Sequence, residues 1–165
     1  YMYTKQNFID SVINDIRIIK HLVEKFSAEN ADFRPTPSQR SVEELLQYLS
    51  YVGSTTAGVI LDGDMSVYGP ASETAKSVII ENFATAMDTE VEKFKAVMEK
   101  FNDENLQGEV NMYGQGQKTR AVYLIDTILK WYAAYKLQLF MYLKMLGNDK
   151  IGTSNLWGGM DMPVK

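Results

Sequence analysis

Cysteine is absent from this 165-residue chain, and histidine occurs once, at position 21. Without cysteine the chain has no disulfide and no catalytic thiol. With one histidine it has no Glu-x-x-His pairs of the kind that di-iron bundles use. A Ser-His-Asp arrangement would need His21, which is remote in sequence from any activating serine motif. The common chemistries based on cysteine and histidine are therefore excluded.

Basic clusters and long apolar runs are also missing. Lys and Arg number 17 against 21 Asp and Glu, so the formal net charge is −4. Because phosphate binding needs a concentrated positive face, we expect no nucleic-acid partner. No apolar run approaches the roughly 18 residues typical of a spanning helix, and negative charge disfavours anionic membranes, so we expect no membrane partner. Residues 1–6 lack a leader pattern, and a cytoplasmic location is expected.

Helical patterns dominate what is present. Apolar residues recur at steps of mostly three and four over about residues 4–26, 41–61, 72–101 and 119–147. No segment alternates as a half-buried strand does, although residues 110–116 could form a short extended pair. A hydrophobic content of 45% supports a sizeable core. We therefore predict one all-α domain over residues 1–165.

Local signals place the helix ends and the exposed faces. Ser41 followed by Glu44 is a capping box, Thr119 is the expected cap at the start of the last helix, and Gly147 is its expected stop. Helical spacing puts His21 on a solvated stripe of the first helix. Glu90 falls among the charged residues that we assign to a solvated face of the third helix.

The small residues and the tail carry further expectations. The stretch Gly53–Gly58 permits close approach of a neighbouring helix or leaves room for a ligand, and close approach is the preferred interpretation. The last helix is apolar almost all round, so it is either central or covered by a second subunit. The glycine-rich tail is expected to fold back and dock the indole of Trp157. Gly114–Thr119 fails the phosphate-loop pattern, because Gln117 precedes the lysine.

An aromatic face on the last helix is the main candidate site. Trp131, Tyr135, Gln138 and Tyr142 follow one another at steps of three or four and project from nearly the same face. One interpretation is a plain core stripe. The other is a pocket, because a buried amide, two hydroxyls and an indole N–H all need hydrogen-bond partners.

Three segments resemble a known family. FRPTPSQRSVEELL at residues 33–46 is similar to the first signature of the DinB-like, YfiT-like superfamily of four-helix bundles. YKLQLFMYLKMLG at residues 135–147 is similar to its closing signature, in which Gln138 and Leu143 match, Lys144 replaces an arginine and Leu137 replaces a glycine. The tail LWGGMDMP at residues 156–163 also resembles family members. The resemblance covers essentially the whole chain and implies a four-helix bundle with long connections, dimeric through apolar helix surfaces.

The resemblance also implies a metal site for which this chain lacks the ligands. In that family a metal, often described as nickel or zinc, is bound by three histidines, one from the second helix and two from the last. The matching positions hold Tyr48, Trp131 and Tyr135. Indole is no ligand, and phenolate would serve only a hard ferric ion with help that the sequence does not show. We therefore predict no metal and no cofactor.

Two hypotheses for function follow. The favoured one is a metal-free relative whose former ligand cavity is filled or narrowed by Tyr48, Trp131 and Tyr135. Its role would be small-molecule binding or assembly, as a homodimer. The alternative is a metal-independent enzyme, transferase- or isomerase-like, that binds an organic substrate in the same pocket. Tyr48 or Tyr135 would then transfer the proton and Gln138 would orient the substrate, although the sequence offers no neighbouring cation to lower a tyrosine pKa.

Overall fold

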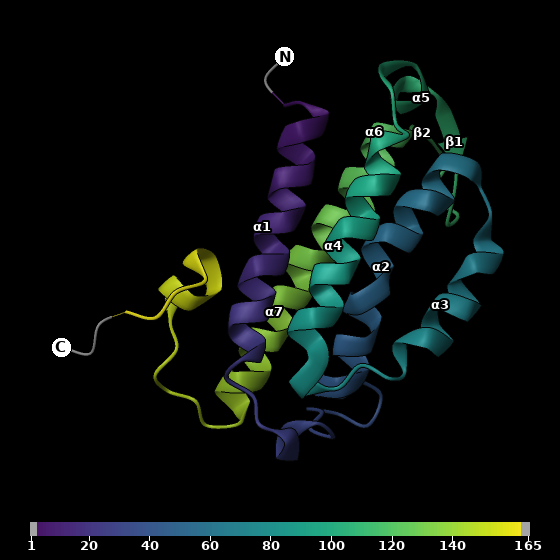
Figure 1. Cartoon of the computed structure of the whole chain (residues 1–165). Helices are drawn as coiled ribbons and strands as arrows, with labels where there is room; N and C mark the ends of the chain where they lie inside the picture. The colour runs from purple at the N-terminus through teal and green to yellow at the C-terminus, as the bar shows by residue number, and fades with distance from the viewer. Residues whose placement is uncertain (1–2, 163–165) are drawn as a thin grey trace.

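Four helices lie side by side in the computed structural model, which describes residues 3–162 (Figure 1). They are α1 (Lys5–Val23), α2 (Val42–Asp62), α4 (Phe83–Glu99) and α7 (Lys130–Met145). α2 packs against α4, and α1 packs against both α7 and α4. The prediction of an all-α four-helix bundle is confirmed. Within the described range, no helix combines the length and apolarity needed to cross a bilayer.

Long connections carry the shorter elements. The helical ones are η1 (Ala28–Asn30), η2 (Met65–Val67), α3 (Tyr68–Ala75), η3 (Ile80–Asn82), α5 (Asp103–Gln107), α6 (Arg120–Leu124), and the π-helical stretches η4 (Ile125–Leu129) and η5 (Ser154–Gly158). Strands β1 (Glu109–Asn111) and β2 (Gln117–Thr119) form an antiparallel hairpin. In Figure 1 this hairpin lies at one end of the bundle, and α3 runs outside α2. The extended pair expected near residues 110–116 is present, with its strands on either side of the loop.

The capping box predicted for the second helix is present. The Ser41 hydroxyl accepts the Glu44 amide at 3.2 Å, and the Glu44 carboxylate accepts the Ser41 amide at 2.8 Å. Two amides without helical partners are thereby satisfied at once. The helix ends at Gly63, whose φ of 83° lies in the left-handed region that glycine adopts without a Cβ clash.

The third helix, expected over about residues 72–101 with room for a bend near its start, is divided there into α3, η3 and α4. The break falls at the β-branched run Val78-Ile79-Ile80, whose side chains lose rotamer freedom in a helix. Asn82 fixes the break: its side chain accepts the Ile79 amide and donates to the Ser77 carbonyl, both at 2.9 Å. The new start allows α4 to turn Glu90 toward the core.

The last helix runs from Arg120 to Met145 through α6, η4 and α7. Thr119 caps its start, as predicted, by accepting the Val122 amide at 3.3 Å. Inside the π-helical stretch η4, the Thr127 hydroxyl donates to the Tyr123 carbonyl at 2.6 Å. Gly147, with a φ of 88°, follows the end of α7.

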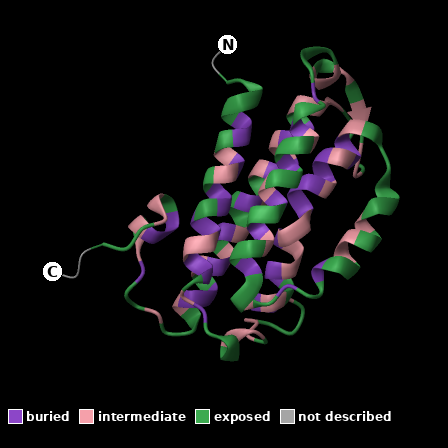
Figure 2. Cartoon of the chain, in the orientation of Figure 1, coloured by how far each residue is buried: buried purple, intermediate pink, exposed green. Residues whose placement is uncertain are grey.

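The buried surfaces of the bundle face one another (Figure 2). The core is aliphatic and aromatic, and its largest fully buried side chains include Tyr123, Tyr132, Tyr142, Phe83, Phe94 and Phe101. α7 contributes a buried face of Tyr132, Lys136, Leu139 and Leu143, and it exposes Leu137, Met141 and Met145. The last helix is therefore central on one side only.

Two expectations about exposure were wrong. Glu90 is 1% exposed rather than solvated. The His21 ring is covered by the tail, with Asn155 Nδ2 at 3.0 Å from its Nε2. The tail folds back as expected, and the Trp157 ring lies against Lys136 although the residue stays 67% exposed. Arg17 helps to hold the tail by donating to the Gly158 carbonyl at 2.9 Å.

A buried ion pair joins α7 to α1. The Lys136 ammonium lies 2.6 Å from the Asp15 carboxylate, and the two side chains are only 5% and 11% exposed. Burying two charges is tolerated because each satisfies the other. Trp157 lies over the pair, with its ring centroid 5.0 Å from the ammonium. The pair sets which face of α7 points inward.

Two buried side chains approach Gly53 closely, Tyr132 from α7 and Glu90 from α4. A Cβ at this position would lie 2.7 Å from the Tyr132 hydroxyl, 2.9 Å from its ring and 3.1 Å from a Glu90 oxygen. The Tyr132 hydroxyl donates to the Leu49 carbonyl at 3.1 Å. The first residue of the small-residue stretch therefore leaves the space that side chains of two neighbouring helices occupy.

Gly53→Ala is expected to destabilise the protein by roughly 1–3 kcal/mol, because a methyl group there overlaps Tyr132 and Glu90. Urea unfolding measures the free energy of unfolding. Gly58→Ala is the matched control: it lies in the same helix, nothing lies within 4 Å of its Cβ, and alanine should stabilise by about 0.5–1 kcal/mol. Equal effects of the two substitutions would contradict the close approach.

Candidate functional site

The three residues that the sequence resemblance matches to metal ligands do not all meet. Tyr48 on α2 and Tyr135 on α7 are in edge-to-face contact, with ring centroids 5.4 Å apart. Trp131 packs instead against Tyr113 of the hairpin loop, with centroids 6.2 Å apart. All four rings are half-buried and packed on the core. The two predicted residues that touch are therefore Tyr48 and Tyr135, and the third lies beside them.

Arg40, which the sequence did not single out, completes the group. Its guanidinium carbon lies 4.3 Å from the centroid of the Tyr48 ring and 6.0 Å from that of Tyr135. A guanidinium over an aromatic face is attracted by the negative face of the ring. Because Arg40 precedes the capping serine in a turn, no helical periodicity linked it to the aromatic face. We call Arg40, Tyr48, Tyr113, Trp131 and Tyr135 the aromatic cluster.

Gln138 acts on the cluster from one side. Its amide nitrogen donates to the Tyr142 hydroxyl at 2.6 Å, and that hydroxyl donates to the Arg40 carbonyl at 2.8 Å. Tyr142 is itself fixed by edge contact with Phe33. The sequence predicted that Gln138 lines the pocket; in the structure it is half-buried and holds the Arg40 backbone through Tyr142.

A chain of hydroxyl groups adjoins the cluster. Thr56 on α2 is 2.9 Å from the Tyr68 hydroxyl, which is 2.8 Å from the Tyr113 hydroxyl. Tyr51 adds a further ring, at 5.7 Å from Tyr48. Burial raises the pKa of Tyr48 and of Tyr113 well above the usual tyrosine value. Both phenols therefore stay neutral and act as hydrogen-bond donors near neutral pH.

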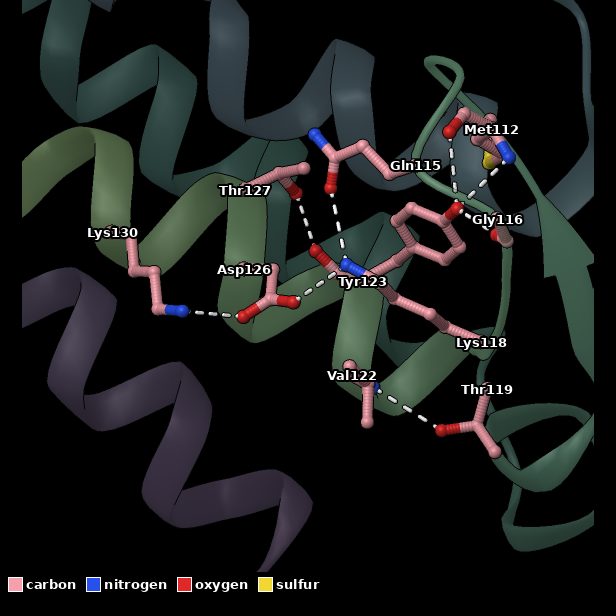
Figure 3. Close-up of polar contacts among 10 residues, drawn as sticks. All are labelled: Met112, Gln115, Gly116, Lys118, Thr119, Val122, Tyr123, Asp126, Thr127 and Lys130. Carbon is pink, nitrogen blue, oxygen red and sulfur yellow. Dashed lines mark hydrogen bonds and ion pairs between the residues drawn. The ribbon is translucent and has the colours of Figure 1, made fainter.

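The hairpin loop that carries Tyr113 is anchored by Tyr123 (Figure 3). The Tyr123 hydroxyl receives the Met112 amide at 3.0 Å and contacts the Met112 and Gly116 carbonyls at 3.0 and 2.5 Å. Tyr113 between them has a φ of 55°, which is uncommon for a residue other than glycine. Backbone strain of this kind persists only where the surroundings impose it. The anchored loop thus holds Tyr113 against Trp131.

The start of the last helix supports the same loop. Lys118 of β2 reaches both Gln115 at 3.2 Å and Asp126 at 3.0 Å, as Figure 3 shows. Hydrogen bonds from Lys130 and then Lys118 hold the pKa of Asp126 below its usual value. A charged carboxylate between two ammonium groups therefore ties β2 to η4.

A buried polar group lies beneath the cluster. The Glu90 carboxylate accepts the Ser54 amide and the Ser54 hydroxyl, each at 2.7 Å, and no cation lies within ion-pair distance among residues 3–162. Burial raises the pKa of Glu90 to about 7, although the Ser54 hydrogen bonds oppose the rise. Helical spacing does place Glu90 on the buried face, three residues after Met87 and four before Phe94, but its charge led us to assign it to the solvated face.

Metal ligands do not assemble anywhere in the described part of the chain. No group of three or more His, Cys, Asp or Glu side chains is placed to hold an ion among these residues. A cavity of ≈ 450 Å³ is lined by Tyr113 together with Val59, Met65 and Met112, and the rings of Tyr48, Trp131 and Tyr135 do not line it. The chemistry at hand is that of rings, hydroxyls and one guanidinium.

The bundle has the fold of DinB-like proteins. A DinB-like protein of Bacillus subtilis, YjoA, has a crystal structure that matches with a TM-score of 0.67 and 21% identity, over 88% of this chain and 94% of that one. A protein from Exiguobacterium sibiricum described as a member of the DinB family matches with a TM-score of 0.66 and 21% identity, over 93% and 99%. At this identity the likeness shows the fold alone. The resemblance stated from the sequence is confirmed at that level.

The comparison of sequences leads to the same relative. The chain is 21% identical to the uncharacterized protein YjoA of Bacillus subtilis over 151 residues, which are 91% of this chain and 96% of that protein. No family model matches the chain. The relative's name gives no activity.

Glu90 predicts a pH dependence of stability. Its folded pKa, about 7, lies above the ordinary 4.5, so the folded state keeps a proton that the unfolded state has lost. Stability should therefore fall as pH rises from about 5 to about 8, by up to about 3 kcal/mol. Below pH 4.5 Glu90 is protonated in both states, so the stability no longer changes with pH through this group and is at its full value.

Urea unfolding at pH 5, 6, 7 and 8 measures this fall. Glu90→Gln should flatten it, because the amide does not titrate. Glu99→Gln, at an exposed position of the same helix, should leave it unchanged. An unaltered slope in Glu90→Gln would assign the pH dependence to another group.

Proposed function

We propose that this protein is a non-catalytic binding protein whose aromatic cluster takes a small, planar organic ligand. The observation that carries the proposal is the half-buried edge-to-face contact of Tyr48 and Tyr135 at the positions of metal ligands in the family. Rings packed on a core and still partly open to solvent offer a rigid apolar surface with polar edges. This is typical of a recognition surface for a flat molecule.

The hydroxyl groups support binding. Neither the Tyr48 nor the Tyr135 hydroxyl has a hydrogen-bond partner among the described residues. No polar side-chain atom in that range is both fully buried and unpaired, so the Tyr48 hydroxyl reaches solvent. It can therefore donate a hydrogen bond to a molecule from outside.

The alternative, a metal-independent enzyme, has weaker support. Proton transfer near neutral pH requires a pKa near the working pH. The guanidinium of Arg40 acts to lower the Tyr48 pKa, so a neighbouring cation does exist, contrary to the expectation from sequence. Burial nevertheless outweighs Arg40 and raises the Tyr48 pKa. A phenol that stays neutral can donate a hydrogen bond but is poorly suited to act as a general base.

The cytoplasmic location stays a prediction from the sequence.

Ligand binding should be detectable through Trp131. The chain has two tryptophans, so Trp157→Phe leaves Trp131 as the single reporter. A library of small planar compounds should contain members that change its emission saturably and raise the melting temperature, because binding stabilises the folded state. Tyr135→Ala in the same background should weaken binding about tenfold or more, through loss of stacking surface.

The converse variant is the control. Trp131→Phe keeps only the exposed Trp157, whose emission should not respond to the same compounds. A response from Trp157, or an unchanged affinity in Tyr135→Ala, would place binding elsewhere. An absence of any saturable binder would overturn the proposed function.

We further propose that the protein assembles as a homodimer through the exposed face of α7. Leu137, Met141 and Met145 are 49%, 42% and 55% exposed and follow one another at steps of four. A two-fold interface places a surface against its own copy, so a face free of like charges suits a second copy of this chain. The exposed alanines Ala133 and Ala134 continue the face and permit close approach.

Leu137→Lys together with Met141→Lys should convert the dimer to a monomer, because two ammonium groups on each copy would meet across the axis. Sedimentation velocity measures the mass in solution. Met65→Lys is the control, since this methionine is 50% exposed on η2, on another side of the bundle. A wild-type protein that sediments as a monomer at high micromolar concentration would contradict the dimer.

A further inference from the structure

The positive charge of Arg40 is not neutralised by an ion pair with any residue in the described range. The residue is exposed, and within the range 3–162 its guanidinium makes neither an ion pair nor a hydrogen bond; only its backbone carbonyl is engaged, by Tyr142. Arg34, six residues earlier, is different. It is 3.2 Å from Glu44 and donates to the Gln39 carbonyl at 3.2 Å.

The surrounding charges leave the position net positive. The charge of Arg40 acts on the carboxylate of Glu44. That carboxylate already accepts a hydrogen bond from the Ser41 amide and forms an ion pair with Arg34. These contacts, of which the hydrogen bond from the Ser41 amide has the largest effect, keep the pKa of Glu44 below its usual value. The carboxylate is therefore charged, and its charge is already paired with Arg34. Two guanidinium groups thus lie near one carboxylate, and only Arg34 is paired with it. The net charge of the whole chain is −4. The local sign is opposite to that of the whole chain.

The guanidinium of Arg40 lies against the rings of the aromatic cluster. The guanidinium is stacked on Tyr48, which leaves its N–H edge for an acceptor. The hydroxyls of Tyr48 and Tyr135, which lack partners within the described range, are donors on the same two rings. The face of Tyr48 is already covered by a cation, so a second cation would be repelled. The backbone of Arg40 is fixed by the relay from Gln138.

We propose that the ligand of the aromatic cluster is an anion, a planar carboxylate whose oxygens pair with the Arg40 guanidinium and whose flat body lies against Tyr48 and Tyr135. The inference rests on the proposed function and adds the class of ligand. Guanidinium matches carboxylate in shape and can form two parallel hydrogen bonds with it. The neutral phenols add donors that an anion accepts and a cation cannot.

Benzoate, benzamide and benzamidinium test the charge directly, because they share one shape and differ in charge. Binding is followed by Trp131 emission in the Trp157→Phe protein and by the NMR shift of the Arg40 Nε–H. Benzoate is expected to bind about tenfold more tightly than benzamide, and benzamidinium should give no saturable change. Benzoate binding should weaken as sodium chloride rises from 20 to about 500 mM, because salt screens an exposed charge.

Variants locate the charge. Arg40→Gln should lower benzoate affinity about tenfold, and Arg40→Lys should lose less because it keeps the charge without the planar fork. Lys100→Gln removes one exposed positive charge just after α4, at the opposite end of the bundle from the start of α2, and should change nothing (Figure 1). Because Arg40 is exposed, Arg40→Gln should keep its melting temperature, which shows that any loss of binding is not a loss of folding.

The outcomes separate the two proposals. Equal binding of benzoate and benzamide would overturn the anion and leave a binding protein for neutral rings. Planar compounds that bind while benzoate does not would do the same. Full benzoate affinity in Arg40→Gln would overturn the role of Arg40. Failure of all planar compounds, charged and neutral, would overturn the anion together with the binding function.

Discussion

The packing of Tyr132 of α7 against Gly53 of α2 is the constraint on which the candidate site depends. With no side chain on Gly53, the Tyr132 phenol enters the space and donates to the Leu49 carbonyl of the facing helix. That contact ties the middle of α7 to the middle of α2. Tyr48 precedes Gly53 by five residues and Tyr135 follows Tyr132 by three, so the two rings meet at 5.4 Å. The aromatic cluster is therefore a consequence of how the bundle packs.

The three residues that the sequence resemblance matches to metal ligands do not all converge. Three ligands of one ion must converge on a single point. Here Tyr48 and Tyr135 converge, whereas Trp131 is turned to Tyr113, which a strained and well-anchored loop presents to it. The hairpin thus becomes part of the candidate site. Recognition by such rings depends on contact area and a few hydrogen bonds.

Local rules in the sequence predicted the helices, their caps at Ser41 and Thr119, and the shared face of Trp131, Tyr135 and Gln138. Contacts between distant segments decided the rest. Helical spacing puts Glu90 on the stripe of Met87 and Phe94, but only the packing of α4 on α2 supplies its partner, Ser54. Likewise, Arg40 reaches Tyr135 from 95 positions away, and the partner of Lys136 is 121 positions away. The partners of such groups carry no periodic signal, because tertiary contacts bring them together.

The two proposed surfaces share a boundary. Gln138 follows Leu137 of the exposed α7 face by one residue, and its amide begins the relay through Tyr142 to the Arg40 carbonyl. A second subunit seated on Leu137 and Met141 would therefore pack beside the group that positions the guanidinium. Covering Gln138 by association would exclude water from its hydrogen bond to Tyr142 and so strengthen the relay that positions Arg40 for a ligand. Assembly and ligand binding would then be coupled in one direction and, by thermodynamic necessity, equally in the other.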